Sequence, residues 1–202
     1  MMNMNKHSRG PAGAGQVRII GGQWRGRKLP VPVSAGLRPT TDRVRETLFN
    51  WLAPEMAQAR CLDCFAGSGA LGIEALSRYA GHVTLLELDP AVARQLSANL
   101  QTLKTTQGHV VQGNTLQWLN TPGEPYDIVF VDPPFRKGLL SETLTLLENK
   151  GWLSGEALIY IECETEHAPP EVPASWRLYR EKVAGQVAYR LYHRSVPDRQ
   201  GE

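Results

Sequence analysis

The sequence predicts an α/β fold built on a mostly parallel, seven-stranded sheet. From residue 60 onward, short and almost wholly apolar segments alternate with segments whose apolar residues recur at helical spacing, which is typical of a parallel sheet covered on both faces. A Gly-Ser-Gly turn at residues 67–69 joins the first of these strands to its helix, as at the opening of a βαβ unit. The last two strands, Trp176–Val183 and Val187–His193, flank Ala184-Gly185-Gln186, so we expect an antiparallel hairpin at one edge.

The segment before this sheet predicts an arm, a hairpin and a helix. Two strands, Gln16–Ile20 and Gln23–Leu29, are expected to form a basic hairpin with Gly21-Gly22 as a two-residue turn. Thr41 or Asp42 is the expected N-cap of a helix that ends before Pro54. Its apolar stripe is Val44, Leu48 and Leu52, with Arg43 and Arg45 off the stripe. The predicted organisation is a flexible arm (1–15), a basic β-hairpin extension (16–36), one α/β domain (37–194) and a flexible tail (195–202).

Within the domain, strands and helices are expected to alternate in strict order. The predicted parallel strands are Arg60–Phe65, His82–Glu87, His109–Gln112, Tyr126–Val131 and Ala157–Glu162. The predicted helices are Leu71–Tyr79, Ala91–Leu103, Thr115–Leu119 and Leu139–Asn149.

Charge is unevenly distributed along the chain. The net charge is +2, yet residues 1–52 hold nine Lys and Arg against two acids. A basic front on a slightly acidic body indicates a polyanionic partner. No apolar run approaches the roughly 20 residues that span a membrane. Three cysteines form no disulfide framework, which fits a reducing cytoplasm.

The turn at residues 67–69 predicts a binding site for a small ligand. Glycines let the backbone approach a ligand closely, and the following helix start favours an anionic group there. The motif Gly67-Ser68-Gly69-Ala70-Leu71-Gly72, with Glu87 ending the next strand, also fits a nicotinamide dinucleotide site with a ribose-binding carboxylate. Asp63 lies inside the preceding strand, where a carboxylate suits a ligand's ammonium group rather than a pyrophosphate.

The tetrapeptide Asp132-Pro133-Pro134-Phe135 is the most specific signal in the chain. It follows the apolar strand at 126–131, at the edge of the sheet where α/β proteins bind ligands. The exocyclic amine of a nucleobase is a poor nucleophile because its lone pair is delocalised into the ring. We expect the Asp132 carboxylate and the Pro133 carbonyl to accept its two hydrogens and free the lone pair. Phe135 is suited to stacking on the base.

The N-terminal hairpin predicts a surface for single-stranded RNA. Arginines suit phosphates, and an exposed tryptophan suits stacking on a base, although a tryptophan in the core is the alternative. Arg136 and Lys137, beside the expected base pocket, are candidates for a further phosphate contact. The candidate RNA-binding residues are Arg18, Trp24, Arg25, Arg27, Lys28, Arg136 and Lys137.

A redox or metal role for Cys61-x-x-Cys64 is disfavoured. Zinc needs a second pair of ligands, which Cys163 alone does not supply, and the five histidines show no ligand spacing. We therefore expect no metal.

Together these residues resemble a known family. Asp63-x-Phe65-x-Gly67-x-Gly69, Glu87, Gly113-Asn114 and the DPPF tetrapeptide look like class I S-adenosylmethionine-dependent methyltransferases that modify exocyclic amines. More narrowly, RIIGGQWRGRKL, LRPTTDRVRETLFNWL, CLDCFAGSGALGIEALSR and FVDPPFRKGLL resemble the bacterial 16S ribosomal RNA guanine-N2 methyltransferases, over roughly residues 16–194. The resemblance implies a Rossmann-like class I methyltransferase fold.

The resemblance also implies roles for particular residues. Asp63 and the glycine turn would hold the methionine part of S-adenosylmethionine, Glu87 the ribose hydroxyls, and Asn114 would lie beside the adenine. The segment Arg38-Pro39-Thr40 would close over the cofactor. The full cofactor-binding set is Arg38, Thr40, Asp63, Phe65, Ala66, Gly67, Ser68, Gly69, Glu87, Leu88, Asn114, Thr115 and Asp132. Residues Asp132, Pro133, Pro134 and Phe135 would form the catalytic target-base pocket.

The implied reaction transfers a methyl group to the N2 amine of a guanine in 16S rRNA, with S-adenosylhomocysteine as the second product and no metal. Because the base must leave any stack, base flipping or an unpaired loop is expected. The partner would be 16S rRNA, naked or in an assembled small subunit, and the protein a cytoplasmic monomer. A DNA or other RNA amino-methyltransferase (adenine N6 or cytosine N4), a nicotinamide-dependent dehydrogenase and a pure RNA-binding module stay open as alternatives.

Overall fold

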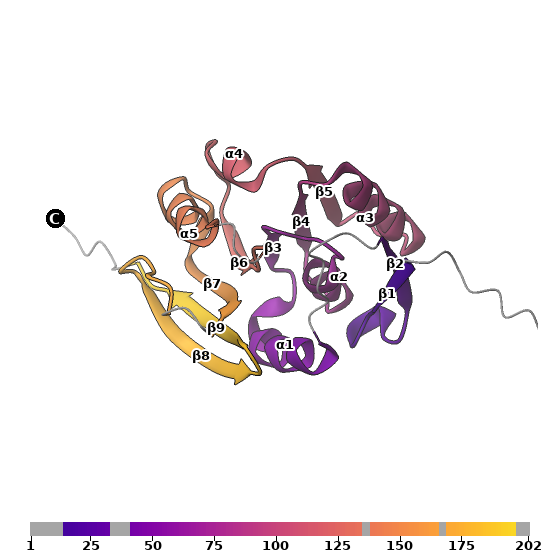
Figure 1. Cartoon of the computed structure of the whole chain (residues 1–202), viewed down its shortest axis with the longest axis horizontal. Helices are drawn as coiled ribbons and strands as arrows, with labels where there is room; N and C mark the ends of the chain where they lie inside the picture. Colours follow the sequence, from indigo (N-terminus) through magenta and orange to yellow (C-terminus); the bar gives the residue numbers. More distant parts are fainter. Residues whose placement is uncertain (1–13, 33–40, 135–137, 166–168, 197–202) are drawn as a thin grey trace, which may run out of the picture.

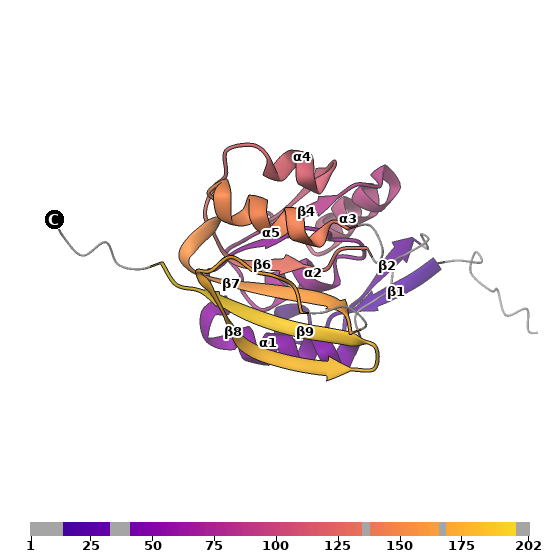
Figure 2. The ribbon, with the colours of Figure 1, turned by 60° about the vertical axis from the view of Figure 1, so that its left-hand side comes forward.

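The computed structural model describes residues 14–32, 41–134, 138–165 and 169–196, and its centre is a seven-stranded sheet of order β5-β4-β3-β6-β7-β9-β8 (Figures 1 and 2). Five strands are parallel, and β9 runs antiparallel between β7 and β8. The bounds are β3 Arg60–Asp63, β4 His82–Glu87, β5 Gly108–Gln112, β6 Tyr126–Val131, β7 Leu153–Glu164, β8 Trp176–Ala184 and β9 Val187–Arg194. The predicted fold class is confirmed, including the C-terminal hairpin.

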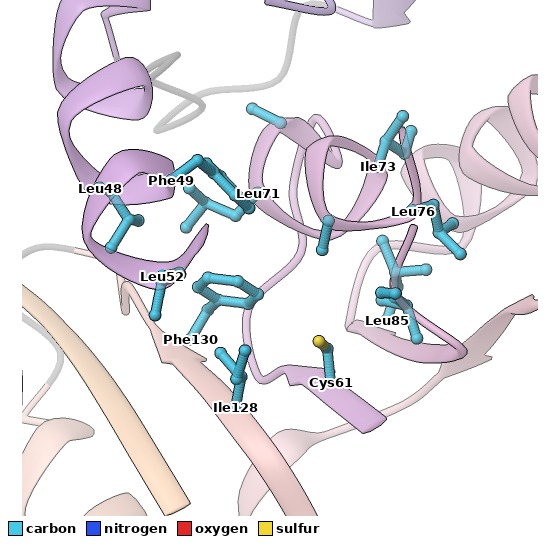
Figure 3. Packing of buried hydrophobic residues seen from close by; sticks show 14 of the residues in the cluster. Leu48, Phe49, Leu52, Cys61, Leu71, Ile73, Leu76, Leu85, Ile128 and Phe130 are labelled. Atoms are coloured by element: carbon cyan, nitrogen blue, oxygen red, sulfur yellow. The ribbon is translucent and has the colours of Figure 1, made fainter. Parts of the chain in front are cut away.

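The helices cover both faces of this sheet. They are α1 Asp42–Met56, α2 Ala70–Ser77, α3 Pro90–Thr102, α4 Thr115–Leu119 and α5 Leu140–Asn149. Alternate strand residues point to opposite faces, so each face has its own apolar core. One core joins α1, α2 and α3 to the sheet, and the other joins α4 and α5 to it. Figure 3 shows the first core, where Phe49 of α1 faces Phe130 of β6, with ring centroids 5.9 Å apart.

The N-terminal hairpin exists, but its predicted two-residue turn is wrong. Strands β1 (Ala14–Arg18) and β2 (Lys28–Pro32) are joined by a nine-residue connection that contains a 3₁₀ turn, η1 (Gly22–Trp24). The glycines serve contact with α2 rather than a tight turn, because a Cβ at Gly22 would lie 2.0 Å from the Ser77 carbonyl oxygen. Gly22 also has a φ of +77°, which favours glycine.

Two expectations about α1 are also wrong. The helix continues through Pro54 to Met56, because a proline in the last turns removes only the hydrogen bond to the Asn50 carbonyl, and Asn50 is exposed. Arg45 is not on the outer face: it is 2% exposed and pairs with Asp42 and Glu74. The predicted N-cap is confirmed, since the Thr41 hydroxyl accepts a hydrogen bond from the Val44 N–H.

Strands β4 and β6 and helix α4 have the expected bounds, and the remaining elements of the domain differ from expectation by up to four residues at an end. Strand β7 begins at Leu153 rather than Ala157, and β3 ends at Asp63 rather than Phe65. No helix in the described part of the chain is long and apolar enough to cross a membrane.

Candidate active site

The candidate site lies at the carboxyl ends of the parallel strands. The strand order reverses between β3 and β6, and such a switch point is where open α/β sheets bind ligands. Asp63 ends β3, Glu87 ends β4, Asn114 follows β5, and Asp132 follows β6. The structure therefore brings together predicted residues that the sequence separates by up to 69 positions.

The glycine turn between β3 and α2 is held by backbone geometry that favours glycine. Gly67 and Gly69 have φ values of +53° and +79°. A Cβ at Gly69 would lie 2.6 Å from Cδ2 of Leu96, and the Ala66 N–H donates to the Leu86 carbonyl. Phe65 and Ser68 are half-buried beside this turn. The turn thus places the start of α2 directly against the β3 end.

Asp63 is a buried carboxylate with an unused acceptor. It is 1% exposed, and its Oδ2 accepts a hydrogen bond from the Gly72 N–H at 3.1 Å. Within the described residues its Oδ1 has no hydrogen-bond partner. Burial, opposed by the nearby backbone N–H groups of Gly72 and Phe65 and reinforced by the charge of Glu87, raises the pKa of Asp63 to about 7. An ammonium group of a ligand fits this oxygen and would relieve both the desolvation and the missing hydrogen bond.

Glu87 is fixed by two backbone donors. Its Oε2 accepts from the Gly67 N–H at 2.8 Å, and its Oε1 accepts from the Asp89 N–H at 3.1 Å. Each carboxylate oxygen keeps a further lone pair, so the half-buried side chain can also accept hydrogen bonds from ligand hydroxyls.

A cavity of about 280 Å³ lies at the carboxyl ends of β4 and β5, over the start of α4. Its wall combines the apolar side chains of Leu86, Val111 and Trp118 with the amide groups of three polar residues. The Trp118 ring stacks on Trp152 with centroids 4.3 Å apart, which fixes its position. A flat heteroaromatic ring fits such a wall. The polar lining residues are Gln112, Asn114 and Gln117.

The predicted cofactor-binding residues around this cavity differ in how far their side chains are buried and in their hydrogen bonds. The Asn114 side chain caps α4 by accepting from the Gln117 N–H, and Thr115 is buried with its hydroxyl donated to the Cys64 carbonyl. Leu88 is 60% exposed. Trp118 and Gln117 were not predicted as site residues. The only indication in the sequence was that they lie one helical turn after Asn114.

The predicted target pocket contains a second carboxyl group. Asp132 and Pro133 are half-buried and Pro134 is exposed. A hydrogen bond links the Asp132 carboxyl group to that of Glu162, which ends the buried part of β7. Burial and the neighbouring carboxyl groups of Glu162 and Asp63 raise the pKa of Asp132 well above its usual value. Glu162 was not among the predicted site residues, and its only signal in the sequence was an acid at the end of an apolar strand.

The cations of the N-terminal hairpin are exposed. Arg18, Arg25, Arg27 and Lys28 reach solvent, and none of the four forms an ion pair within the described residues. Arg18 lies directly opposite Lys28 in the hairpin register. Trp24 is half-buried against the core that contains α2, so only part of its ring is open to stacking.

Five predicted site residues lie outside the described residues: Arg38, Thr40, Phe135, Arg136 and Lys137. Cys61 and Cys64 belong to the cores on opposite faces of the sheet, so they do not share a ligand or form a redox pair. The part of the chain that the structure describes holds no group of three or more His, Cys, Asp and Glu suited to a metal ion.

The chain is similar to known proteins over nearly its whole length. The family described as conserved hypothetical protein 95 matches residues 17–193. The ribosomal RNA small subunit methyltransferase D of Escherichia coli K12 is 67% identical over 191 residues, which cover 95% of each chain. The protein of the same name from Haemophilus influenzae is 54% identical and covers 90% of this chain and 96% of its own.

A solved structure shares both fold and sequence with this chain. The putative methyltransferase of E. coli has 66% identity and a TM-score of 0.85, over 90% of this chain and 99% of its own. The fold is therefore that of the class I methyltransferases, and the chain, which is similar over nearly its whole length to proteins named ribosomal RNA small subunit methyltransferase D, belongs to the conserved hypothetical protein 95 family.

Proposed function

We propose that this protein transfers a methyl group from S-adenosylmethionine to the exocyclic N2 amine of a guanine in 16S rRNA. The observation that carries the proposal is the adjacency of Asp63 and Asp132 on neighbouring strands β3 and β6. The first offers a buried acceptor to an ammonium group, and the second would accept the amine of the target base. The names of the relatives from E. coli and H. influenzae support rRNA of the small subunit as the substrate.

The residues present fit S-adenosylmethionine. Asp63 would hold its ammonium group, Glu87 its ribose hydroxyls, and the cavity beside Trp118 its adenine. The cofactor supplies an electrophilic methyl group on a positively charged sulfur. Asp63, Asp132 and Glu162 lie near one another on three adjacent strands, and their negative charge favours a cationic ligand there.

The carboxyl groups beside the glycine turn argue against a nicotinamide dinucleotide. A pyrophosphate placed at the glycine turn would meet Asp63 and Glu87, and the repulsion of like charges in a partly buried site is costly. The glycines of the GxGxxG match therefore fit a turn whose backbone contacts the positively charged amino acid part of S-adenosylmethionine better than one that binds a pyrophosphate.

In the target pocket, the chain orients the amine rather than forming a bond to it. The Asp132 carboxyl group and the Pro133 carbonyl would accept the two amine hydrogens and turn the nitrogen lone pair toward the methyl group. Pro133 and Pro134 stiffen this turn and lack N–H groups that would compete for the same acceptors. Stacking by Phe135 would hold the base in plane.

The exposed cations of the hairpin would bind the RNA backbone. The hairpin is fastened to α2, the helix that begins at the cofactor turn, so RNA bound there would be held at a fixed distance from the site. We propose that Arg18, Arg25, Arg27 and Lys28 contact phosphates, together with Arg136 and Lys137, in a cytoplasmic monomer.

Nucleoside mass spectrometry of rRNA tests this function. In cells that lack the protein, we expect the loss of one N2-methylguanosine from 16S rRNA. The wild-type chain should restore it, and Asp132→Ala should not, although Asp132→Ala should still bind S-adenosylhomocysteine. An unchanged 16S rRNA profile, with a loss of N6-methyladenine or N4-methylcytosine in DNA or other RNA, would favour those substrates instead.

A further inference from the structure

The strand register places Glu162 beside Asp132. In the parallel pair β6–β7, Phe130 is opposite Tyr160 and Val131 is opposite Ile161, so the next step brings Asp132 opposite Glu162. Phe130 and Tyr160 belong to the core under α1, and side chains two residues further along a strand share that face. The two carboxyl groups therefore point to the same side of the sheet, where a hydrogen bond joins them.

This hydrogen bond fixes the number of protons. A carboxylate only accepts hydrogen bonds, so two carboxyl groups are hydrogen-bonded to each other only when one of them carries a proton. The Tyr160 hydroxyl donates to Oε2 of Glu162 at 3.2 Å, which favours the ionised form of Glu162. In the cofactor-free protein the shared proton therefore lies on Asp132, and the pair carries a single negative charge.

Burial favours retention of this proton. Glu162 is 7% exposed, and burial raises its pKa, against the lowering effect of the hydrogen bonds from Tyr160 and Asp132. Burial and the charges of Glu162 and Asp63 raise the pKa of Asp132 further. Two like charges side by side in a buried site do not both ionise easily.

A protonated Asp132 is a poor acceptor for an amine, yet the proposed function needs it to accept one. We propose that Glu162 is a positioning residue that takes the shared proton from Asp132 when the amine of the target base arrives, so that Asp132 meets the amine as a carboxylate. This inference rests on the proposed function, and it adds a proton-holding partner to the target site.

The protons balance through the step. The amine that gains a methyl group loses one hydrogen as a proton, and the electron pair of that N–H bond stays on the nitrogen. Asp132 takes this proton while Glu162 still holds the shared one. The pair passes from a charge of −1 to neutral, and the release of one proton to water restores the starting state.

The titration of the pair depends on the groups around it. Four groups of the sheet, one carboxyl, two phenols and one thiol, surround it, and one cation lines the small cavity between α1 and Tyr160. The side chains that α1 contributes to this cavity do not titrate: Val44, Thr47, Leu48 and Trp51. The surrounding titratable groups are Asp63 on β3, Tyr160 and Cys163 on β7, Tyr189 on β9 and Lys182 on β8.

The first test uses the cofactor-free protein. Carbon-13 NMR of labelled carboxyl groups would follow the titration of Asp132 in wild type, Glu162→Gln and Tyr160→Phe. Loss of the neighbouring charge in Glu162→Gln should move the Asp132 midpoint to lower pH by about one unit or more. Tyr160→Phe keeps the buried volume and should move it in the same direction by less. Glu156→Gln, an exposed position at the far end of β7, is the matched control.

The second test measures methyl transfer to rRNA against pH. With a weaker base at Asp132, Glu162→Gln should lower kcat about tenfold at neutral pH. It should also shift the acid limb of the profile, which in wild type marks the formation of the singly charged pair, to higher pH. KM for the RNA should stay close to wild type, and Glu156→Gln should leave the whole profile unchanged.

The outcomes separate the two proposals. An Asp132 midpoint that is the same in wild type and Glu162→Gln overturns the shared proton, whatever the enzyme methylates. A shifted midpoint with an unshifted kcat profile overturns the role of Glu162 in transfer. A wild-type protein that makes no N2-methylguanosine overturns the proposed function, while the NMR titration still tests the pair by itself.

Discussion

The carboxylate of Glu74 accepts a hydrogen bond from the Ile20 N–H at 2.8 Å, and this contact fastens the N-terminal hairpin to helix α2. The same side chain is fully buried and also accepts from the Gly21 N–H and from Arg78, and it pairs with Arg45. Because α2 begins at the glycine turn of the site, Glu74 connects the candidate RNA surface to the candidate cofactor turn. One buried acid therefore sets the position of two functional parts.

Replacing Glu74 by Gln should destabilise the protein by about 3–5 kcal/mol. The amide keeps only one acceptor oxygen, and the guanidinium of Arg45 stays buried with a weakened counter-charge. Urea unfolding followed by circular dichroism measures the change. The control is Glu46→Gln on the exposed side of α1, which should stay within about 0.5 kcal/mol of wild type. A loss below 1 kcal/mol in Glu74→Gln would contradict the anchoring role.

Gly72→Ala should weaken both the fold and cofactor binding. A Cβ there would lie 2.6 Å from Cδ2 of Leu85 and 3.2 Å from Oδ2 of Asp63, so the core must shift, at a cost of about 1–3 kcal/mol. Since Asp63 would move with it, the affinity for S-adenosylhomocysteine should fall as well. Gly155→Ala, in open space on β7, should change neither quantity, as thermal unfolding and isothermal titration calorimetry would show.

Cofactor binding should weaken as the pH falls below 7. Asp63 has a raised pKa of about 7, and only its ionised form pairs with the ammonium group of the ligand. Below pH 7, binding must first remove a proton, so the affinity for S-adenosylhomocysteine should fall by up to about tenfold per pH unit. Calorimetry in buffers of different ionisation enthalpy should detect a proton released on binding at pH 6. In Asp63→Asn both the affinity and its pH dependence should be lost.

Asp63→Asn should stabilise the cofactor-free protein at alkaline pH. The folded pKa of Asp63 lies above the unfolded value, so the folded state retains a proton between about pH 4 and 7 that the unfolded chain releases. Wild-type stability therefore falls as the pH rises through this window. Asn has no proton to lose, so the variant should gain on the order of 4 kcal/mol over wild type at pH 8 and little at pH 4. Equal stability of both proteins at pH 8 in urea titrations would contradict the buried charge.

The alternation of strands and helices and the positions of Asp63, Glu87 and Asp132 at strand ends followed from local signals. Short stretches of sequence are enough to recognise an apolar strand, a helical spacing or an acid at a strand end. Parallel pairing of the strands then brings their carboxyl ends to one edge of the sheet. The hairpin turn was not predicted correctly, because Gly21-Gly22 has the composition of a tight turn. The contact between Gly22 and Ser77 of α2, which requires the glycine, is a tertiary contact that local sequence does not show. Arg45 was misplaced for the same reason, since its buried partner Glu74 lies on another helix.

The partner of Asp132 was also beyond local reasoning. Glu162 lies 30 positions away, and its proximity depends on the register between β6 and β7, which shifts near Tyr126 and Ile128. A one-residue slip would turn Glu162 to the other face, so no pattern within one strand reveals the contact.

Lys28→Ala should separate RNA binding from stability. Lys28 lies directly opposite Arg18, and both are exposed, so two like charges face each other across the hairpin. Removal of one should leave the free energy of unfolding unchanged or raise it by a few tenths of a kcal/mol. If the pair binds phosphates, RNA affinity should fall, and the slope of log affinity against log salt should shrink by about 0.7–0.9. The control is Arg177→Ala on the exposed edge strand β8, for which we expect the wild-type slope. An unchanged slope in Lys28→Ala would remove the hairpin from the RNA interface, and the RNA contacts would then have to be sought at other cations.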